Sequence, residues 1–355
     1  MRSISDTIAR LTQLSPPALR TGGSKDDLAP LDGWGNNPGA LRALLHVPPS
    51  LAAHAPLVVV LHGCTQTAAD YNHGSGWSEL ADRFGFALLF PEQQRANNPH
   101  VCFNWFSPED VRRGSGEVES IREMVVAAIG QHGLDPARVF VTGLSAGGAM
   151  TSALLACHPE IFAGGAIIAG LPFGTARGVP EALERMRGRG HDRASLAERV
   201  RAVSAHRGPW PAVSVWHGSS DGTVDAINAA MIVEQWRGLH GVGEPDTTER
   251  VAGHLHRTWR DGAGRVVIED YVIAGMGHGT PLSTHGDEAC GTPGPHMLDA
   301  GISSTYRIAA AWGIVPAVPP LRATVTPPAA PVSPARFDPA ATINDALRAA
   351  GLIRP

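Results

Sequence analysis

Ser145 lies between two glycines in the segment Gly143-Leu144-Ser145-Ala146-Gly147, a spacing that could present its hydroxyl as a nucleophile. An apolar, β-branched run precedes the segment, and small apolar residues at helical spacing follow it. This order is typical of a strand that turns sharply at the serine and continues as a helix. Such a turn leaves no room for side chains two positions on either side, which accounts for both glycines. The alternative is an ordinary strand-to-helix loop that contains a serine.

A serine hydroxyl becomes a nucleophile when an imidazole accepts its proton, and a carboxylate must fix the tautomer of that imidazole. Asp221 and His278 follow Ser145 in the order serine, acid, histidine, and each comes directly after a predicted strand. Asp225 is the chief alternative to Asp221, but its position indicates a cap on the following helix. An aspartate in a turn also commonly bonds to nearby backbone.

The chain has 16 histidines, so the choice of His278 depends on its surroundings. Glycines at 275, 277 and 279 indicate a close-packed loop after the last strand. His285 and His296 are the alternatives for the base. Four more histidines lie within or directly beside predicted strands, where structural hydrogen bonding is the commoner role: His62, His217, His254 and His256.

Acyl transfer also needs two backbone N–H groups directed at the developing oxyanion. Ala146 follows the nucleophile and is expected to supply one of them. The loop after the buried strand 56–61 begins His62-Gly63-Cys64, and we expect Cys64 to supply the other. An ordinary tight turn at His62-Gly63 is the alternative.

Motifs over the length of the chain arrive in the order of one known family: LHGCTQTAADY, GFALLFPEQ, CFNWF, GSGEVESIREMV, DPARVFVTGLSAGGAM, HPEIFAGGAIIAG, VWHGSSDGTV, EQWRGLHG and GMGHGTP. Residues 41–312 thereby resemble the polyhydroxybutyrate (PHB) depolymerase family of esterases. The resemblance implies an α/β-hydrolase fold and an esterase that needs no metal or cofactor. The family also includes feruloyl and acetylxylan esterases.

Carried onto this sequence, the resemblance implies Ser145 as nucleophile, Asp221 as the orienting acid and His278 as base, in agreement with the residues themselves. It also implies a disulfide between Cys64 and Cys102, which would tether the oxyanion loop to the loop at 104–105. Family members are largely secreted, whereas the N-terminal sequence lacks the continuous apolar region of a signal peptide and so favours a cytoplasmic protein with reduced thiols.

Three residues are expected to bind substrate: Trp105, Asn104 and Trp210. Aromatic side chains at strand ends can stack on an acyl chain or ring, although core packing is the alternative for any of the eight tryptophans. Cys157 is expected to be buried in the helix after the nucleophile. Cys290 is a candidate partner for it in a second disulfide.

Strands alternating with helices predict an α/β protein with a mostly parallel central sheet and helices on both faces. Predicted strands cover 41–47, 56–61, 86–90, 139–145, 163–169, 211–216, 249–259 and 265–273, the last two joined as a hairpin. Predicted helices cover 1–15, 77–84, 117–131, 146–157, 227–239, 302–312 and 341–350. Sites form at the carboxyl ends of such strands, where the chemical residues above all fall.

The chain is expected to divide into an N-terminal helix and surface segment (1–40), a catalytic domain (41–315), a proline- and alanine-rich linker (316–337) and a short C-terminal helix (338–355). The segment 172–206, rich in Arg, Glu and Gly, is expected to form an insertion that covers the sheet edge or the site. A net charge of −4 without a basic stripe argues against nucleic-acid binding. No apolar run is long enough for a membrane span.

The leading hypothesis is a serine carboxylesterase acting on short-chain hydroxyalkanoate esters or PHB, small or polymeric, through an acyl-enzyme. A feruloyl or acetylxylan esterase is the alternative among enzymes. A catalytically silent hydrolase-fold binding protein is the alternative outside them, but no member of the expected catalytic set is missing. The sequence leaves the acyl chain length and the oligomeric state open.

Overall fold

The computed structural model describes residues 28–190 and 192–317. The predicted helices at 1–15 and 341–350 lie outside these residues. The predicted linker also lies outside them, apart from Pro316 and Ala317.

One ten-stranded sheet organises the described residues, in the order β1-β2-β4-β3-β5-β6-β7-β10-β9-β8. Its strands are β1 (Ala29–Pro30), β2 (Arg42–His46), β3 (Leu57–Leu61), β4 (Ala87–Glu92), β5 (Val139–Leu144), β6 (Gly164–Ile168), β7 (Ala212–Gly218), β8 (Thr247–Val251), β9 (His254–Arg260) and β10 (Val266–Ile273). Two short strands, β11 (Thr280–Leu282) and β12 (Met297–Asp299), pair separately in parallel.

The centre of the sheet is parallel from β4 through β3, β5, β6 and β7 to β10, which confirms the predicted mostly parallel α/β architecture. Antiparallel strands flank it on both sides. The predicted hairpin joins β9 to β10. The single strand predicted over 249–259 is instead two antiparallel strands, because the chain turns at Ala252 and Gly253, both with positive φ.

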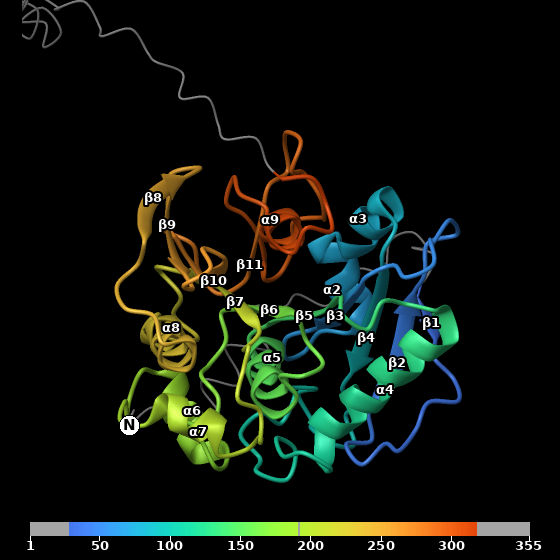
Figure 1. Ribbon diagram of the computed structural model, residues 1–355, viewed down its shortest axis with the longest axis horizontal. Helices are drawn as coiled ribbons and strands as arrows, with labels where there is room; N and C mark the ends of the chain where they lie inside the picture. Colours follow the sequence, from blue (N-terminus) through green and yellow to red (C-terminus); the bar gives the residue numbers. More distant parts are fainter. Residues whose placement is uncertain (1–27, 191, 318–355) are drawn as a thin grey trace, which may run out of the picture. The chain divides into compact units, whose positions relative to one another are not determined.

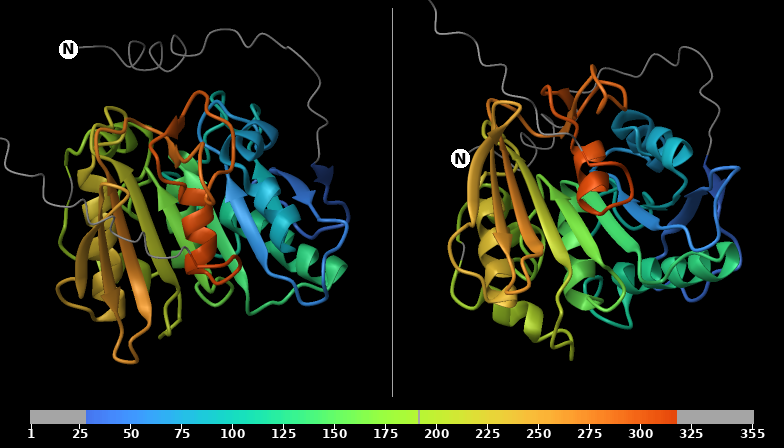
Figure 2. Two further views of the ribbon diagram at one scale, coloured as in Figure 1. Left: turned by 90° about the horizontal axis from the view of Figure 1, so that it is seen from above. Right: turned by 45° about the horizontal axis from the view of Figure 1, so that its top comes forward.

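Helices cover both faces of the sheet, as predicted (Figures 1 and 2). They are α2 (Ala68–Ser75), α3 (Trp77–Phe84), α4 (Gly116–His132), α5 (Ala146–Cys157), α6 (Val179–Met186), α7 (Leu196–Arg201), α8 (Ile227–His240) and α9 (Ser304–Ala311). Helices α4, α5 and α8 lie on one face, and α2, α3 and α9 lie on the other. None of the helices in the described ranges is both long enough and apolar enough to span a bilayer.

Two hydrophobic cores follow from this layering. Leu57, Val59 and Leu61 of β3 pack into the core shared with α4, α5 and α8, whereas Val58 and Val60 pack into the core shared with α2, α3 and α9. Successive side chains of a strand point to opposite faces, so a strand covered on both faces must be apolar throughout. This requirement explains the continuous apolar run in the sequence.

Helix α2 was not expected, because Asn, Gly and Ser in its sequence have low helix propensity. A capping box compensates at its start: the Thr67 hydroxyl accepts the Asp70 amide, and the Asp70 side chain accepts the Thr67 amide. Residues 29–30, expected to lie in a surface segment, instead pair with β2 as the edge strand β1.

Candidate active site

Ser145 occupies a strained turn between β5 and α5. Its φ of 57° and ψ of −115° are rarely adopted by residues with a side chain, and its amide donates to the Ile168 carbonyl at 2.8 Å. A Cβ on Gly143 would lie 2.5 Å from the Gly147 backbone, and a Cβ on Gly147 would lie 2.4 Å from the Leu61 carbonyl oxygen. Both glycines are therefore required by close packing of backbone around the serine.

His278 and Asp221 form an oriented pair beside this turn. The His278 Nδ1 lies 2.7 Å from Asp221 Oδ2, so it carries the proton and donates it to the carboxylate. The other oxygen, Oδ1, accepts the amides of Thr223 at 2.8 Å and Val224 at 2.9 Å. The Nε2 atom of His278 is left as the basic nitrogen, and His278 and Ser145 line the same cavity.

The Asp221 side chain is fully buried. Burial acts to raise the pKa of its carboxyl, but the hydrogen bond and charge of His278 outweigh it and hold the pKa below its ordinary value. His217 lies behind it, with Nε2 at 2.9 Å from the Val224 carbonyl and 3.5 Å from Asp221 Oδ2. Asp225, the rival acid, instead accepts the amide of Ile227, the first residue of α8. The N-cap residue is Ala226, so Asp225 lies one position before the cap expected for it.

Two amides remain available for an oxyanion. Ala146 is the first residue of α5, where an amide has no acceptor one turn back in the helix. In the loop after β3, the amides of Gly63 and Gln66 donate within the loop, and the Thr65 amide donates to the His100 carbonyl. No partner for the Cys64 amide occurs within 28–190 and 192–317. Cys64 also lines the cavity that contains Ser145.

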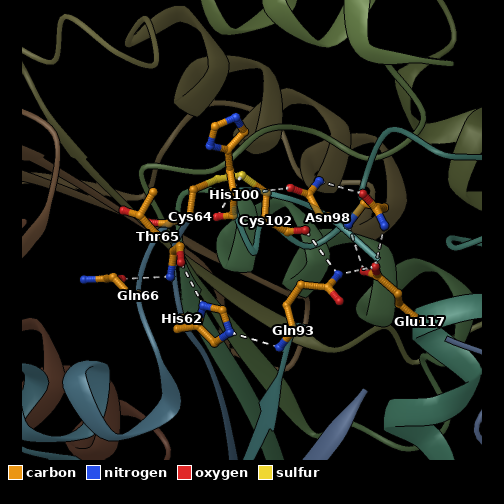
Figure 3. Close-up of a disulfide and its surroundings, with 11 residues drawn as sticks. His62, Cys64, Thr65, Gln66, Gln93, Asn98, His100, Cys102 and Glu117 are labelled. Carbon is orange, nitrogen blue, oxygen red and sulfur yellow. Dashed lines mark hydrogen bonds between the residues drawn. A yellow bond between two sulfur atoms is a disulfide. The ribbon is translucent and has the colours of Figure 1, made fainter. Parts of the chain in front are cut away.

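A disulfide joins Cys64 to Cys102, so the pairing implied by the family resemblance is confirmed (Figure 3). The two loops are also bonded through backbone, because the Thr65 amide donates to the His100 carbonyl at 2.8 Å. Thr65 and Val101, which neighbour the two cysteines, both have positive φ. The loop that offers the Cys64 amide is therefore tied to the 98–106 loop at two adjacent points.

The cavity above Ser145 has a volume of about 290 Å³. One set of lining residues is apolar and comes from α6: Val179, Ala182, Leu183 and Met186. Another comes from the disulfide-linked loops and is mixed in polarity: Thr65, Gln66, Asn98, Pro99, His100, Trp105 and Phe106. Helix α6 lies within the segment 172–206, and its last residue, Met186, accepts the Asp225 amide at 2.7 Å, which anchors it beside α8.

The three residues expected to bind substrate are placed differently. Trp105 lines the cavity, edge-on to Phe106 with ring centroids 5.5 Å apart. Asn104 does not line it; its side chain bonds to Glu117 and Asn98 inside the loop. Trp210 does not line it either, because it precedes β7 at the amino end of that strand, whereas the site lies at the carboxyl ends. It packs edge-on against Trp236.

Cys157 and Cys290 are both buried and free, so the second disulfide considered for them is wrong. The Cys157 sulfur lies 3.1 Å from the Val111 carbonyl in one core. The Cys290 sulfur lies 3.3 Å from the Ser303 hydroxyl in the other. The central sheet separates the two cores, which explains why the cysteines do not pair.

His296, considered above only as an alternative base, lies beside His278. Its Nδ1 is 3.1 Å from the His278 carbonyl oxygen, the two rings are roughly perpendicular, and its own φ is 62°. His296 also lines the cavity. His285, the other alternative, is exposed in the loop before β12.

Comparison with known proteins identifies related sequences and a related structure. The sequence model described as Esterase PHB depolymerase matches residues 41–259. Poly(3-hydroxyalkanoate) depolymerase C of Paucimonas lemoignei is 44% identical over 293 residues, covering 81% of this chain and 70% of that protein. Feruloyl esterase B of Talaromyces funiculosus is 26% identical over 265 residues, covering 72% and 73%. The structure of an acetyl xylan esterase from Aspergillus awamori matches with a TM-score of 0.65 at 27% identity, covering 72% and 94%.

Proposed function

This chain belongs to the esterase PHB depolymerase family, and from that premise we propose that it is a serine carboxylesterase acting on short-chain 3-hydroxyalkanoate esters, polymeric PHB among them. The observation that carries the proposal is one cavity lined by Ser145, His278 and the apolar side of α6. A nucleophile and a base on a partly apolar cavity suit an ester with a small apolar acyl unit.

In the acylation step, the Ser145 hydroxyl oxygen attacks the ester carbonyl carbon while His278 Nε2 takes the hydroxyl proton. Asp221 stabilises the imidazolium that forms, since His278 Nδ1 already donates to it at 2.7 Å. The negative charge moves to the carbonyl oxygen, where the amides of Ala146 and Cys64 stabilise it. His278 then returns the proton to the departing alkoxide, which leaves as an alcohol and yields the acyl-enzyme.

In the deacylation step, water replaces the alcohol. His278 removes a proton from the water as its oxygen attacks the acyl carbon, and the same two amides stabilise the second oxyanion. Collapse of this intermediate breaks the bond to the Ser145 oxygen, which recovers its proton from His278. The products are a carboxylic acid and the regenerated serine.

Two features favour a short acyl unit. A cavity of about 290 Å³ is at the small end of ligand sites. Its α6 side offers only aliphatic and thioether side chains, which suit the methyl-bearing backbone of a hydroxybutyrate unit. Asn98, His100 and Gln66 add polar groups on the other loops, and these keep an acetylxylan or feruloyl ester as the second candidate.

The disulfide between Cys64 and Cys102 bears on where such an enzyme would act. Disulfides persist mainly in oxidising compartments. The pairing therefore supports an enzyme that meets its substrate outside the reducing cytoplasm.

Product analysis tests the proposal. We expect the wild-type protein to release hydroxybutyrate from PHB film and to cleave p-nitrophenyl butyrate, and we expect Ser145→Ala to do neither. Faster cleavage of methyl ferulate or acetylated xylan than of any hydroxybutyrate ester would replace the substrate proposal. No ester cleavage at all would favour a silent binding protein.

A further inference from the structure

We propose that Glu117 is a positioning residue for the oxyanion hole, because its hydrogen bonds fix the loop that the disulfide joins to Cys64. Glu117 lies in the first turn of α4, and its residue is only 1% exposed. The catalytic steps derived above do not use this carboxyl. The inference depends on the proposed function, since it assigns the residue a part in the reaction of Ser145.

Three N–H groups converge on the Glu117 carboxyl (Figure 3). Its Oε1 accepts the side-chain amides of Gln93 at 2.5 Å and Asn104 at 2.9 Å, and its Oε2 accepts the Asn104 backbone amide at 2.8 Å. No cation of the described chain forms a salt bridge with it. A buried carboxyl without a cation is costly unless hydrogen bonds satisfy it, and all of the donors here come from the site loops and the end of β4.

The Glu117 contacts belong to a closed circuit that contains the oxyanion donor. On one side, the Gln93 side chain also donates to the Cys102 carbonyl at 3.1 Å, and Cys102 is bonded to Cys64. On the other side, the side-chain oxygen of Asn104 accepts an amide proton from Asn98 at 2.9 Å.

The circuit closes through the 98–100 segment. The Asn98 side-chain oxygen accepts the His100 amide at 2.9 Å, and the His100 carbonyl accepts the Thr65 amide next to Cys64. Every link between Glu117 and Cys64 is therefore a covalent bond or a hydrogen bond. A shift of the carboxyl is transmitted to the loop that presents the Cys64 amide.

The amide groups in this circuit cannot rotate to suit a different partner. The Gln93 side-chain oxygen already accepts from Gln94 and Asn97, which fixes its NH₂ group toward Glu117. The Asn104 oxygen is likewise held by Asn98. Glu117 therefore faces donors only. Both oxygens of a carboxyl can accept a hydrogen bond, including the hydroxyl oxygen of the protonated form, whereas the NH₂ group of a glutamine cannot.

Glu117→Gln tests this requirement with little change in shape. One carboxyl oxygen becomes an NH₂ group that faces other N–H donors, so one link of the circuit breaks. We expect kcat for p-nitrophenyl butyrate to fall about tenfold or more, because a displaced oxyanion donor loses part of the 10²–10³ that such a donor supplies. We expect KM to change less than about threefold, and affinity for a trifluoromethyl ketone analogue to fall in parallel with kcat.

Glu119→Gln is the matched control, on the same helix two residues further on. The Glu119 carboxylate bonds to the Arg122 side chain and the Gly114 amide and is not in the circuit, so we expect its kcat to remain within about twofold of wild type. Asn98→Ala breaks the circuit at a half-buried position, where truncation is expected to cost less stability than at the buried Glu117. Because Asn98 also lines the cavity, the exchange of the Thr65 amide decides this variant. If Glu117→Gln does not fold, a lower kcat with faster Thr65 exchange in Asn98→Ala supports the proposal, and unchanged exchange overturns it.

Hydrogen exchange gives a readout that does not need activity. Glu117→Gln should speed exchange of the Thr65 amide and of the 98–106 loop, whereas Glu119→Gln should not. Wild-type kcat together with unchanged exchange at Thr65 in Glu117→Gln would overturn the proposal, as would a loss of kcat without any change in exchange. If the wild type cleaves no ester, the proposed function fails, yet the exchange comparison still tests whether Glu117 fixes the loop.

Discussion

Glu117 gives the most quantitative prediction, because its environment makes stability depend on pH. Burial raises the pKa of its carboxyl to about 8 from an ordinary 4.5, and the charge of Asp110 adds to this effect. A raised pKa means that the folded state holds the proton more tightly than the unfolded state does. The stabilisation is therefore full below about pH 4.5 and is lost as the pH rises through about 8.

Between pH 4.5 and about 8, the contribution of Glu117 to the free energy of unfolding falls by about 1.36 kcal/mol per pH unit. The total change is on the order of 5 kcal/mol. Glu117→Gln carries no titratable group at this position and lacks this component. Urea unfolding of both proteins at intervals from pH 5 to 9 measures it. The stability of wild type relative to the variant should fall steadily over this window.

Glu119→Gln serves as the control here too. Burial acts to raise the pKa of Glu119, but the hydrogen bonds from Arg122 and the Gly114 amide outweigh it and lower the pKa. Its contribution is present above pH 4.5 and is lost only as the pH falls through the lowered value, so its difference curve should be flat from pH 5 to 9. A flat or rising curve for Glu117→Gln would refute the reasoning about its burial.

Further predictions concern the cavity, the base and the disulfide. Val179 at the cavity and Val126 on α4 are similarly exposed, at 52% and 50%. Because only Val179 lines the cavity, Val179→Asp should slow hydrolysis of PHB film several-fold and Val126→Asp should not, and equal effects of the two variants would contradict this. Asparagine tolerates positive φ and keeps a side-chain donor, so His296→Asn should retain roughly tenfold more kcat than His296→Gly. Equal rates would exclude positioning of His278 through the bond from His296. Without reductant the unfolded protein should show two reactive thiols, and four thiols would exclude the disulfide. Reduction of the Cys64–Cys102 bond, which joins residues 38 apart in sequence, should lower the free energy of unfolding by about 4 kcal/mol.

The arrangement of the sheet and the proposed catalytic set followed from local sequence. Apolar runs of strand length predicted the central strands, because a strand covered on both faces has no polar position. Ser145, Asp221 and His278 each follow such a strand, and parallel strands bring their carboxyl ends to one edge. Strand identity and chain order were therefore enough to place the three residues together.

Residues whose roles depend on tertiary contacts could not be predicted in this way. Asn104 was expected at the substrate because its loop faces the site, but its amide points inward to Glu117. Glu117 itself fitted the ordinary preference for acidic residues in a first helical turn, so nothing in the pattern indicated three donors around it. Trp210 lies on the amino side of its strand, where the predicted bounds 211–216 also place it, so its expected role at the substrate conflicted with the rule that sites form at the carboxyl ends.

Helix α6, which forms one wall of the cavity, is a second feature whose position could not be predicted from the sequence. Its apolar residues Val179, Leu183 and Met186 have the spacing of an ordinary amphipathic helix. This spacing predicts that one helix face packs against the rest of the protein, but it does not identify the residues in contact. Anchoring of Met186 to Asp225 places the helix over the cavity, and that bond spans 39 residues of sequence. Long-range contacts of this kind leave no local signal.

The central claim, that Ser145 is the nucleophile of a serine esterase, is tested most directly by covalent trapping. The native protein is treated with a fluorophosphonate, and its intact mass and peptide map are measured by mass spectrometry. We predict a single adduct on the peptide containing Ser145, absent from Ser145→Ala and slowed strongly in Asp221→Asn. No adduct on the wild type, or an adduct on another residue, would contradict the claim.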